Sequence, residues 1–92
     1  MVELTVAVRN KLGLHARAAA RLVRTANQFR SELRLERIDG SASADAKSIL
    51  SVLMLAASGG TELRAIADGQ DEQAAIAAVA WIFDACFGEM TL

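Results

Sequence analysis

Residues 15 to 17 form the segment of this 92-residue chain that is best suited to chemistry on an anion. His15 is the only histidine, and it stands directly before Ala16, where a helical pattern begins. The free N–H groups and the positive dipole end of a helix N-terminus bind anions, and their field favours the neutral, nucleophilic imidazole. Arg17 is close enough to neutralise phosphoryl oxygens. We therefore expect His15 to accept a phosphoryl group that contacts Arg17 and the backbone N–H groups of Ala16 and Arg17.

A simpler interpretation makes His15 a polar residue that only fills a cap position. Histidine is not a preferred N-cap residue, and here Gly13 before it permits a tight bend. A metal site is disfavoured because His15 has no partner ligands, and the only cysteine, Cys86, has no CxxC partner. Cys86 is expected to fill the core rather than to react. Hydrolytic catalysis is disfavoured because no triad-like set of residues is evident, and we expect no cofactor.

Basic residues continue along the helix that follows His15. Arg17, Arg21 and Arg24 are spaced i, i+4 and i+7, so they share one face. Most such stripes are ordinary solvated faces. Beside a phosphorylation site, the stripe favours docking of an acidic partner.

A second short helix offers a complementary apolar surface. Ile49, Leu50, Leu53 and Met54 are too many apolar residues for one buried stripe, although Ile49, Val52 and Leu53 share a face. Exposed members beside a basic site predict a protein-docking surface. Ser48 precedes them at the expected N-cap, where its hydroxyl can accept from a free N–H group.

Charge is distributed unevenly along the chain. Residues 1–37 carry eight Lys or Arg and three Asp or Glu, whereas residues 38–92 carry two and eight. This asymmetry favours an acidic or phosphorylated partner. Nucleic acid is disfavoured because the domain is slightly acidic overall and its basic residues are not interleaved with aromatic ones. Neither a targeting segment nor a membrane-length apolar stretch is evident, so we expect a cytoplasmic protein without membrane insertion.

Patterning predicts seven elements in a single domain, 1–92. Val2, Leu4, Val6 and Val8 alternate with polar residues, as in a strand with one buried face. A helix begins at Ala16, and further strands are predicted at 32–38, 41–45 and 61–67. Helices are predicted at 48–56, closed by a glycine cap in 58–60, and at 71–87, with acidic residues in the first turn and Gly88 at the end. The order β-α-β-β-α-β-α with short connections favours an α+β fold, with helices on one face of an antiparallel sheet.

Two segments resemble one known family. Residues 10–17, Asn-Lys-Leu-Gly-Leu-His-Ala-Arg, are similar to the active-site segment of the HPr family, the histidine phosphocarriers of the bacterial phosphotransferase system. Residues 46–50, Ala-Lys-Ser-Ile-Leu, are similar to the segment around the family's regulatory serine. The separation of the two segments and the order of elements also fit. The resemblance implies an open-faced β-sandwich with a four-stranded antiparallel sheet and three helices.

The resemblance also implies a carrier function rather than an enzymatic one. His15 would be phosphorylated at Nδ1 by enzyme I, with phosphoenolpyruvate as the source, and would pass the group to an IIA-type acceptor, with Arg17 neutralising the phosphate. Ser48 matches the serine that a dedicated serine kinase phosphorylates in some bacteria. The implied and predicted partner-docking residues are Arg21, Arg24, Lys47, Ile49, Leu50 and Leu53. We expect a monomer.

The chain departs from the family pattern at two places. Ala18 stands where the family usually has proline, and the segment between Ile38 and Lys47 is longer than in the commonest members. Both the sugar-transport and the nitrogen-related branch remain open. An alternative function is a regulatory binding protein controlled by phosphorylation at Ser48, although family members of that kind lack the histidine. A metal or amino-acid sensor of similar topology would leave His15 unexplained.

Overall fold

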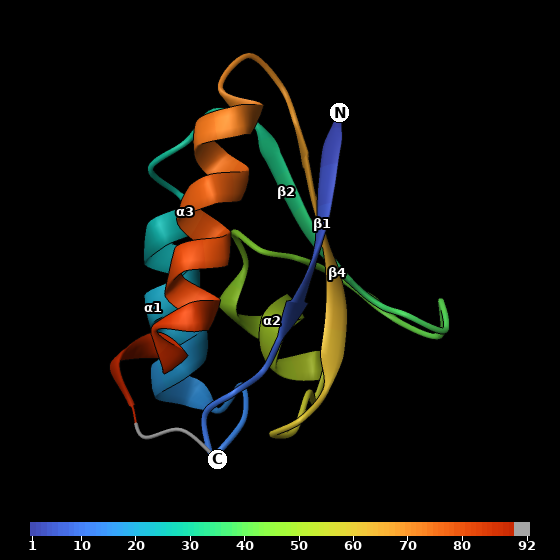
Figure 1. Cartoon of the computed structure of the whole chain (residues 1–92), viewed down its shortest axis with the longest axis vertical. Helices are drawn as coiled ribbons and strands as arrows, with labels where there is room; N and C mark the ends of the chain where they lie inside the picture. Colours follow the sequence, from blue (N-terminus) through green and yellow to red (C-terminus); the bar gives the residue numbers. More distant parts are fainter. Residues whose placement is uncertain (90–92) are drawn as a thin grey trace.

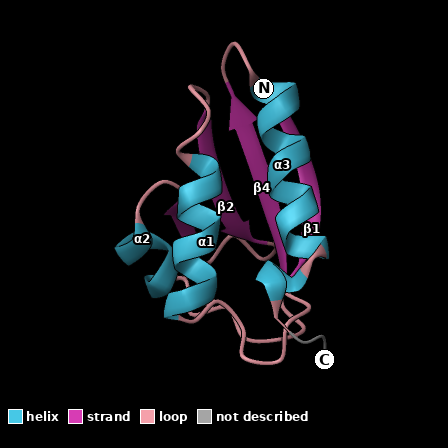
Figure 2. Ribbon diagram, turned by 90° about the vertical axis from the view of Figure 1, so that its left-hand side faces the viewer, coloured by secondary structure: helices cyan, strands magenta, loops and turns pink. Residues whose placement is uncertain are grey.

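Four antiparallel strands form one sheet, and three helices pack on one face of it (Figures 1 and 2). The computed structural model describes residues 1–89, so the last three residues of the predicted 1–92 domain lie outside the described part. The elements in chain order are β1 (Val2–Ala7), α1 (Ala16–Ala26), β2 (Glu32–Arg37), β3 (Ser43–Asp45), α2 (Ile49–Met54), β4 (Glu62–Asp68) and α3 (Glu72–Asp84). The α+β fold and the order of elements are confirmed, and most boundaries shift by one or two residues.

The sheet has the strand order β1-β4-β2-β3, with every neighbouring pair antiparallel. Val2 pairs with Ala67 and Ala7 with Glu62, which fixes the register of β1 against β4. Alternate residues of the two central strands point under the helices and are buried, namely Leu63, Ala65 and Ala67 of β4 and Leu33 and Leu35 of β2. Helix α1 adds Ala18, Ala19, Leu22 and Ala26, and α3 adds Ala75, Val79, Ile82 and Phe83. These residues form one continuous hydrophobic core.

The prediction that Leu4 faces this core is wrong. Val6 and Val8 are buried as the alternation predicts, but Leu4 is 45% exposed. Strand β1 lies at the edge of the sheet and pairs only with β4. An edge strand has a neighbour on one side only, so alternation there does not guarantee burial.

Helix α3 is shorter than predicted. It ends at Asp84 rather than at residue 87, and a 3-10 turn, η1 (Cys86–Gly88), follows it. Cys86 and Phe87 adopt left-handed backbone conformations with φ of 55° and 54°, which a continuous α-helix excludes. Both side chains are nevertheless buried, which confirms that Cys86 belongs to the core. The Asp71 side chain, at the N-terminus of α3, makes no capping bond and instead accepts hydrogen bonds from the backbone N–H groups of Arg30 and Ser31.

Helix α2 exposes most of its apolar residues. Val52 is buried, whereas Ile49 and Leu53 are exposed, in keeping with the prediction that some of these apolar residues lie at the surface. The left-handed residue next to the end of the helix is Ala56, with φ of 52°, and the predicted glycine with positive φ, Gly60 at 93°, lies further along the loop. The Arg37 guanidinium of β2 donates to the Ala56 carbonyl at this end of the helix. None of the helices in the described part of the chain is long and apolar enough to cross a membrane.

Candidate functional site

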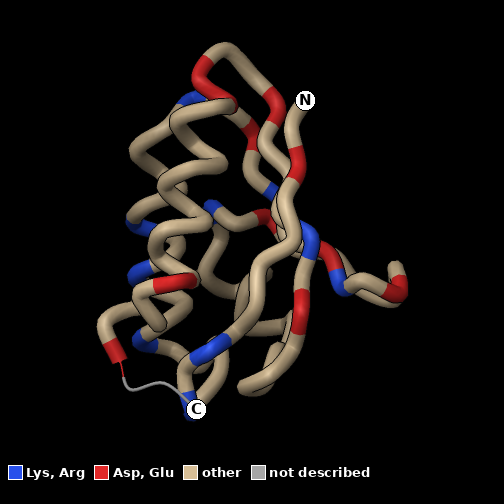
Figure 3. Tube along the Cα trace, viewed as in Figure 1, with Lys and Arg blue, Asp and Glu red and all other residues tan. Residues whose placement is uncertain are grey.

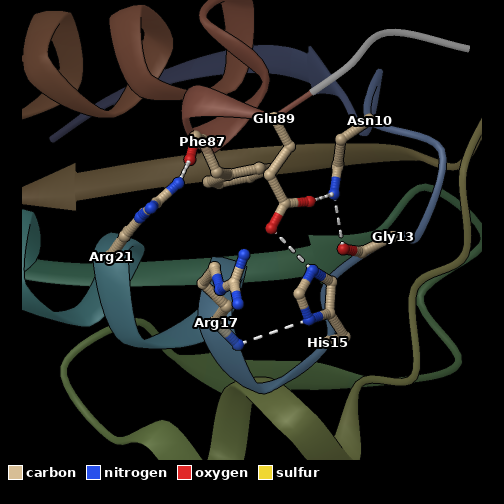
Figure 4. A network of polar contacts seen from close by, with 7 residues as sticks. All are labelled: Asn10, Gly13, His15, Arg17, Arg21, Phe87 and Glu89. Atoms are coloured by element: carbon tan, nitrogen blue, oxygen red, sulfur yellow. Dashed lines mark hydrogen bonds and ion pairs between the residues drawn. The ribbon is translucent and has the colours of Figure 1, made fainter.

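His15 is the N-cap residue of α1, as the sequence predicts. Its φ of −77° and ψ of −179° are extended, and its Nδ1 accepts a hydrogen bond from the Arg17 N–H at 3.3 Å (Figure 4). The backbone N–H groups of Ala16 and Ala18 have no hydrogen-bond acceptor among residues 1–89. Nδ1 therefore lies at the helix N-terminus, beside donors that can bind an anion.

The bend before His15 is held by contacts that only glycine permits. Gly13 has φ of +73°, and a Cβ on it would lie 2.7 Å from the Ala57 carbonyl oxygen. The Leu14 N–H donates to that same oxygen at 2.9 Å. From the other side, Asn10 Nδ2 donates to the Gly13 carbonyl at 2.7 Å. The bond from Leu14 anchors the His15 segment to the chain that follows α2, and the bond from Asn10 closes the loop before His15.

The second imidazole nitrogen contacts a carboxylate from the far end of the chain. His15 Nε2 lies 2.7 Å from Glu89 Oε2, and Asn10 Nδ2 donates to Glu89 Oε1 at 2.9 Å (Figure 4). Burial alone raises the pKa of the Glu89 carboxyl, but hydrogen bonds from Asn10 and His15 and the nearby charge of Arg17 outweigh it, so the pKa lies below its ordinary value. Glu89 is therefore ionised near neutral pH.

This arrangement distinguishes the two nitrogens of the neutral ring. An ionised carboxylate only accepts hydrogen bonds, so Nε2 carries the proton that it donates to Glu89. Nδ1 faces an N–H donor, so it carries the lone pair. The contacts thus leave the lone pair of the neutral ring on Nδ1, the nitrogen that the family resemblance implies as the phosphoryl acceptor.

Glu89 is a site residue that the sequence does not predict. It is 74 residues away from His15 along the chain, and no pattern around it signals a contact. Its position depends on η1, where Arg21 donates to the Phe87 carbonyl and the Glu89 N–H donates to the Cys86 carbonyl. Gly88 before it was predicted only as a helix stop.

A hollow of about 650 Å³ opens beside His15. It is lined by Lys11, Leu12, Arg17, Arg21, Gly88 and Glu89. The Arg17 side chain is exposed and makes no hydrogen bond or ion pair within residues 1–89, so its guanidinium is available to an incoming anion. Three cations around one hollow beside a nucleophilic nitrogen suit a phosphoryl group. Figure 3 shows the succession of basic residues along α1.

The basic residues predicted to dock partners differ in how exposed their side chains are. Arg24 is exposed, whereas Arg21 and Lys47 are half-buried and already donate to the carbonyls of Phe87 and Phe29. Docking by Arg21 and Lys47 stays a prediction, but part of their hydrogen-bonding capacity holds the fold together. Trp81, on α3, is 70% exposed and lines a second hollow together with Arg24.

The apolar part of the predicted docking surface is exposed. Ile49, Leu50 and Leu53 are 44%, 66% and 36% exposed, and the structure adds Leu12 at 71%. Ser48 is the N-cap of α2, because its Oγ accepts from the Ser51 N–H at 3.3 Å. Within residues 1–89, no three His, Cys, Asp or Glu side chains gather as metal ligands would.

Comparison with known proteins defines the class to which this fold and site belong. Residues 2–85 match the family described as the PTS HPr component phosphorylation site. A phosphocarrier protein HPr of Xylella fastidiosa is 45% identical over 91 residues, which cover 99% of this chain and 100% of that protein. A phosphocarrier protein NPr of Shewanella violacea is 40% identical over 88 residues, 96% of this chain and 94% of that protein. The crystal structure of HPr-C-His from Thermoanaerobacter tengcongensis superposes with a TM-score of 0.91 at 39% identity, covering 98% and 99% of the two chains.

The chain therefore belongs to the HPr family of phosphocarrier proteins of the phosphotransferase system. Members of this family are carriers rather than catalysts. Both HPr and NPr proteins are among its relatives, so similarity alone does not assign a branch.

Proposed function

We propose that this protein is a cytoplasmic phosphocarrier that accepts a phosphoryl group on Nδ1 of His15 from phosphorylated enzyme I and passes it to IIA-type acceptor proteins. The observation that carries the proposal is the orientation of the His15 ring. Its lone pair lies at the N-terminus of α1, and its proton faces Glu89. A nitrogen nucleophile beside an anion-binding helix end is what phosphoryl acceptance requires.

Transfer to the protein forms one bond and breaks another. The Nδ1 lone pair attacks phosphorus, the N–P bond forms, and the bond to the donor breaks with its electron pair leaving on the donor group. The Arg17 N–H gives up its long bond of 3.3 Å to Nδ1 and turns to a phosphoryl oxygen. The Arg17 guanidinium neutralises the charge that develops on the other oxygens.

Partner contact is supported by the surface around His15. Leu12, Leu50 and Met54 are large apolar residues with 71%, 66% and 75% exposure. Residues of this kind beside a basic helix suit partners whose surfaces combine apolar and acidic groups. Methionine adapts its shape to more than one such partner.

Incubation with enzyme I and phosphoenolpyruvate, followed by mass spectrometry, tests the function. The wild-type chain should gain one acid-labile phosphoryl group, and His15→Ala should gain none while keeping its fold. The fold should survive because His15 is a half-buried cap residue rather than a core residue. An acid-labile phosphoryl group on His15→Ala, or none on the wild type, would overturn the proposal.

A further inference from the structure

We propose that α1 and α3 together form a second docking surface, which binds an acidic amphipathic helix of a partner protein. Helix α1 lies between α2 and α3 (Figure 2), so this surface is on the side of α1 away from α2 and its exposed apolar residues. It does not include His15, so the proposal goes beyond the proposed function and does not depend on it. The α1–α3 surface consists of Arg21, Arg24, Thr25, Ala74, Ala77 and Trp81.

Trp81 is the apolar anchor of this surface. It is the only tryptophan of the chain, and it is 70% exposed. A single exposed apolar residue is common on protein surfaces. Trp81 differs because it lines a hollow of about 400 Å³ between the two helices, together with the apolar residues Ile82, Ala85 and Phe87. Tryptophan and arginine are the residues that most often dominate the binding energy of an interface, and this hollow has both.

The face of α3 that carries Trp81 is free of charge. Residues 73–81 contain no charged side chain. Ala77 and Ala74 precede Trp81 by four and seven residues, so the three share one face of the helix, and all three are exposed. Asp84 follows Trp81 by three residues, but its carboxylate lies 3.9 Å from the Arg9 guanidinium and does not line the hollow. A partner helix therefore meets an apolar surface on α3, and the small alanine side chains permit a close approach of the two helix axes.

The α1 side of the surface supplies positive charge. Arg24 is exposed, and its guanidinium makes no hydrogen bond or ion pair within residues 1–89. Arg21 uses Nη1 for the Phe87 carbonyl, which leaves its other guanidinium N–H groups for a partner. None of the described residues that line the hollow is acidic. An incoming carboxylate therefore meets only attraction from the hollow, so the complementary partner residues are Asp and Glu.

The spacing of the two arginines suits an occupant that is itself helical. Arg21 and Arg24 are three residues apart, which separates them by about 4.5 Å along the axis of α1. Carboxylates at positions i and i+3 of a partner helix have the same separation. The occupant also needs an apolar face for Trp81 beside its acidic face for α1. An amphipathic helix has both faces, and docking of such a helix in a groove is a recurrent mode of recognition.

A second copy of this chain does not provide such a helix. The exposed face of α1 is basic, and the six residues of α2 include no acidic one. Helix α3 has acidic residues only at its two ends, Glu72 and Asp84. None of the three α-helices in the described part of the chain therefore combines an acidic face with an exposed apolar one. The acidic helix has to come from a different protein.

The α1–α3 surface is continuous with the surface around His15. Arg21 and Gly88 line both hollows, whereas Trp81 and Arg24 line only the one between α1 and α3. Substitutions of Trp81 and Arg24 therefore test the proposed surface without changing a residue that lines the hollow beside His15.

A synthetic peptide tests the proposal on the complete chain. The probe is a helix-forming peptide of about 18 residues, long enough to be helical in isolation, with glutamate on one face, leucine on the other and no aromatic residue. One control peptide has lysine in place of every glutamate, and another has alanine in place of every leucine. Because Trp81 is then the only tryptophan in the sample, its fluorescence reports the contact directly. The glutamate–leucine peptide should shift the Trp81 emission to shorter wavelength in a saturable way, and neither control peptide should.

Variants of the chain locate the contact, with the Kd measured by calorimetry because Trp81→Ala removes the fluorophore. Trp81→Ala should raise the Kd of the glutamate–leucine peptide at least about 10-fold, as expected for an aromatic anchor. Ile38→Ala, which truncates another exposed apolar residue far along the sheet, should leave it unchanged. Arg24→Gln should raise the Kd roughly 2- to 5-fold and reduce its dependence on salt. Arg34→Gln makes the same change of charge at an exposed residue of β2 and should have no effect.

The proposal would be overturned by the absence of saturable binding up to about 1 mM peptide, by equal binding of the lysine peptide, or by a Kd that Trp81→Ala leaves unchanged. Sedimentation velocity adds the stoichiometry, and we expect one chain in the complex. A dimer of the chain that Trp81→Ala abolishes would assign the surface to a second copy and would also overturn the proposal. None of these measurements requires a phosphoryl donor, so their outcome is separate from that of the proposed function.

Discussion

Replacement of Gly13 by alanine should show how strongly the fold constrains the approach to His15. Gly13 has φ of +73°, and a Cβ there would lie 2.7 Å from the Ala57 carbonyl oxygen and 3.0 Å from the Ser58 Cα. Both contacts are with backbone, which cannot rotate away. The alanine therefore has to displace the segment that follows α2 or change its own backbone conformation.

The expected loss of stability has two parts. A left-handed conformation costs an alanine about 1–2 kcal/mol. Displacing Ala57 also weakens the hydrogen bond from the Leu14 N–H, which is worth about 0.5–1.5 kcal/mol. Together these give about 1.5–3.5 kcal/mol in the free energy of unfolding, or roughly 6–28 °C in Tm for a domain of this size.

Gly40→Ala is the matched control for this prediction. Gly40 has φ of +76°, but a Cβ there would have nothing within 4 Å. It should lose only the conformational part, about 1–2 kcal/mol. Urea unfolding measures both variants, and the rate of phosphoryl uptake should fall in Gly13→Ala alone. If the two variants were equally stable and equally reactive, the contact with Ala57 would not position His15.

Four further predictions concern other parts of the molecule. Arg17→Ala should slow phosphoryl transfer at any salt concentration, whereas Arg24→Ala should weaken partner encounter mainly at low salt. Transfer kinetics at two ionic strengths separate the two effects. Equal effects of the two substitutions on turnover would contradict these separate roles. Ala18→Pro should raise the free energy of unfolding by about 0.4–1 kcal/mol, because the N–H that proline lacks has no acceptor within residues 1–89; a lower melting temperature would show that the ring does not fit. Hydrogen bonds from the Ser31 hydroxyl and from two backbone N–H groups lower the pKa of Asp71 to about 2. A lowered carboxyl pKa stabilises the fold above the unfolded value of 3.8, and this contribution is lost as pH falls towards about 2, so Asp71→Asn should flatten the acid side of a melting-temperature profile. Ser48→Asp should keep or raise the melting temperature, because a negative charge at the N-terminus of α2 is stabilising. The same charge should slow phosphorylation of His15, because it repels acidic partners. Unchanged transfer kinetics would leave Ser48 as a helix cap only.

Local patterns predicted most of the fold because each acts over a few residues. The alternation of Leu63, Ala65 and Ala67 places all three in the core, as it does in the structure. The sequence also predicts the caps His15 and Ser48, because a polar side chain before a helix has a local partner, the backbone N–H two or three residues on. Such features need no knowledge of the distant chain.

The end of α3 could not be predicted in this way. Cys86 and Phe87 continue the apolar pattern of the helix, and both are buried although their backbone is left-handed. Packing against Phe83 and the bond from Arg21 to the Phe87 carbonyl decide the outcome. Both are tertiary contacts, so hydrophobic periodicity has no access to them.

The nucleophilic atom of His15 depends on contacts of the same kind. A histidine at a helix N-terminus predicts an anion site and a neutral ring, but it leaves the two nitrogens equivalent, and only the family resemblance implied Nδ1. The structure supplies a physical reason, because Nδ1 faces the Arg17 N–H while Nε2 faces a carboxylate that only accepts. The first contact is local and follows from the cap. The second depends on Glu89, whose backbone is brought back to the site by three residues with positive φ. The tautomer of this histidine is therefore a property of the whole fold, which is why a change at residue 89 is expected to alter chemistry at residue 15.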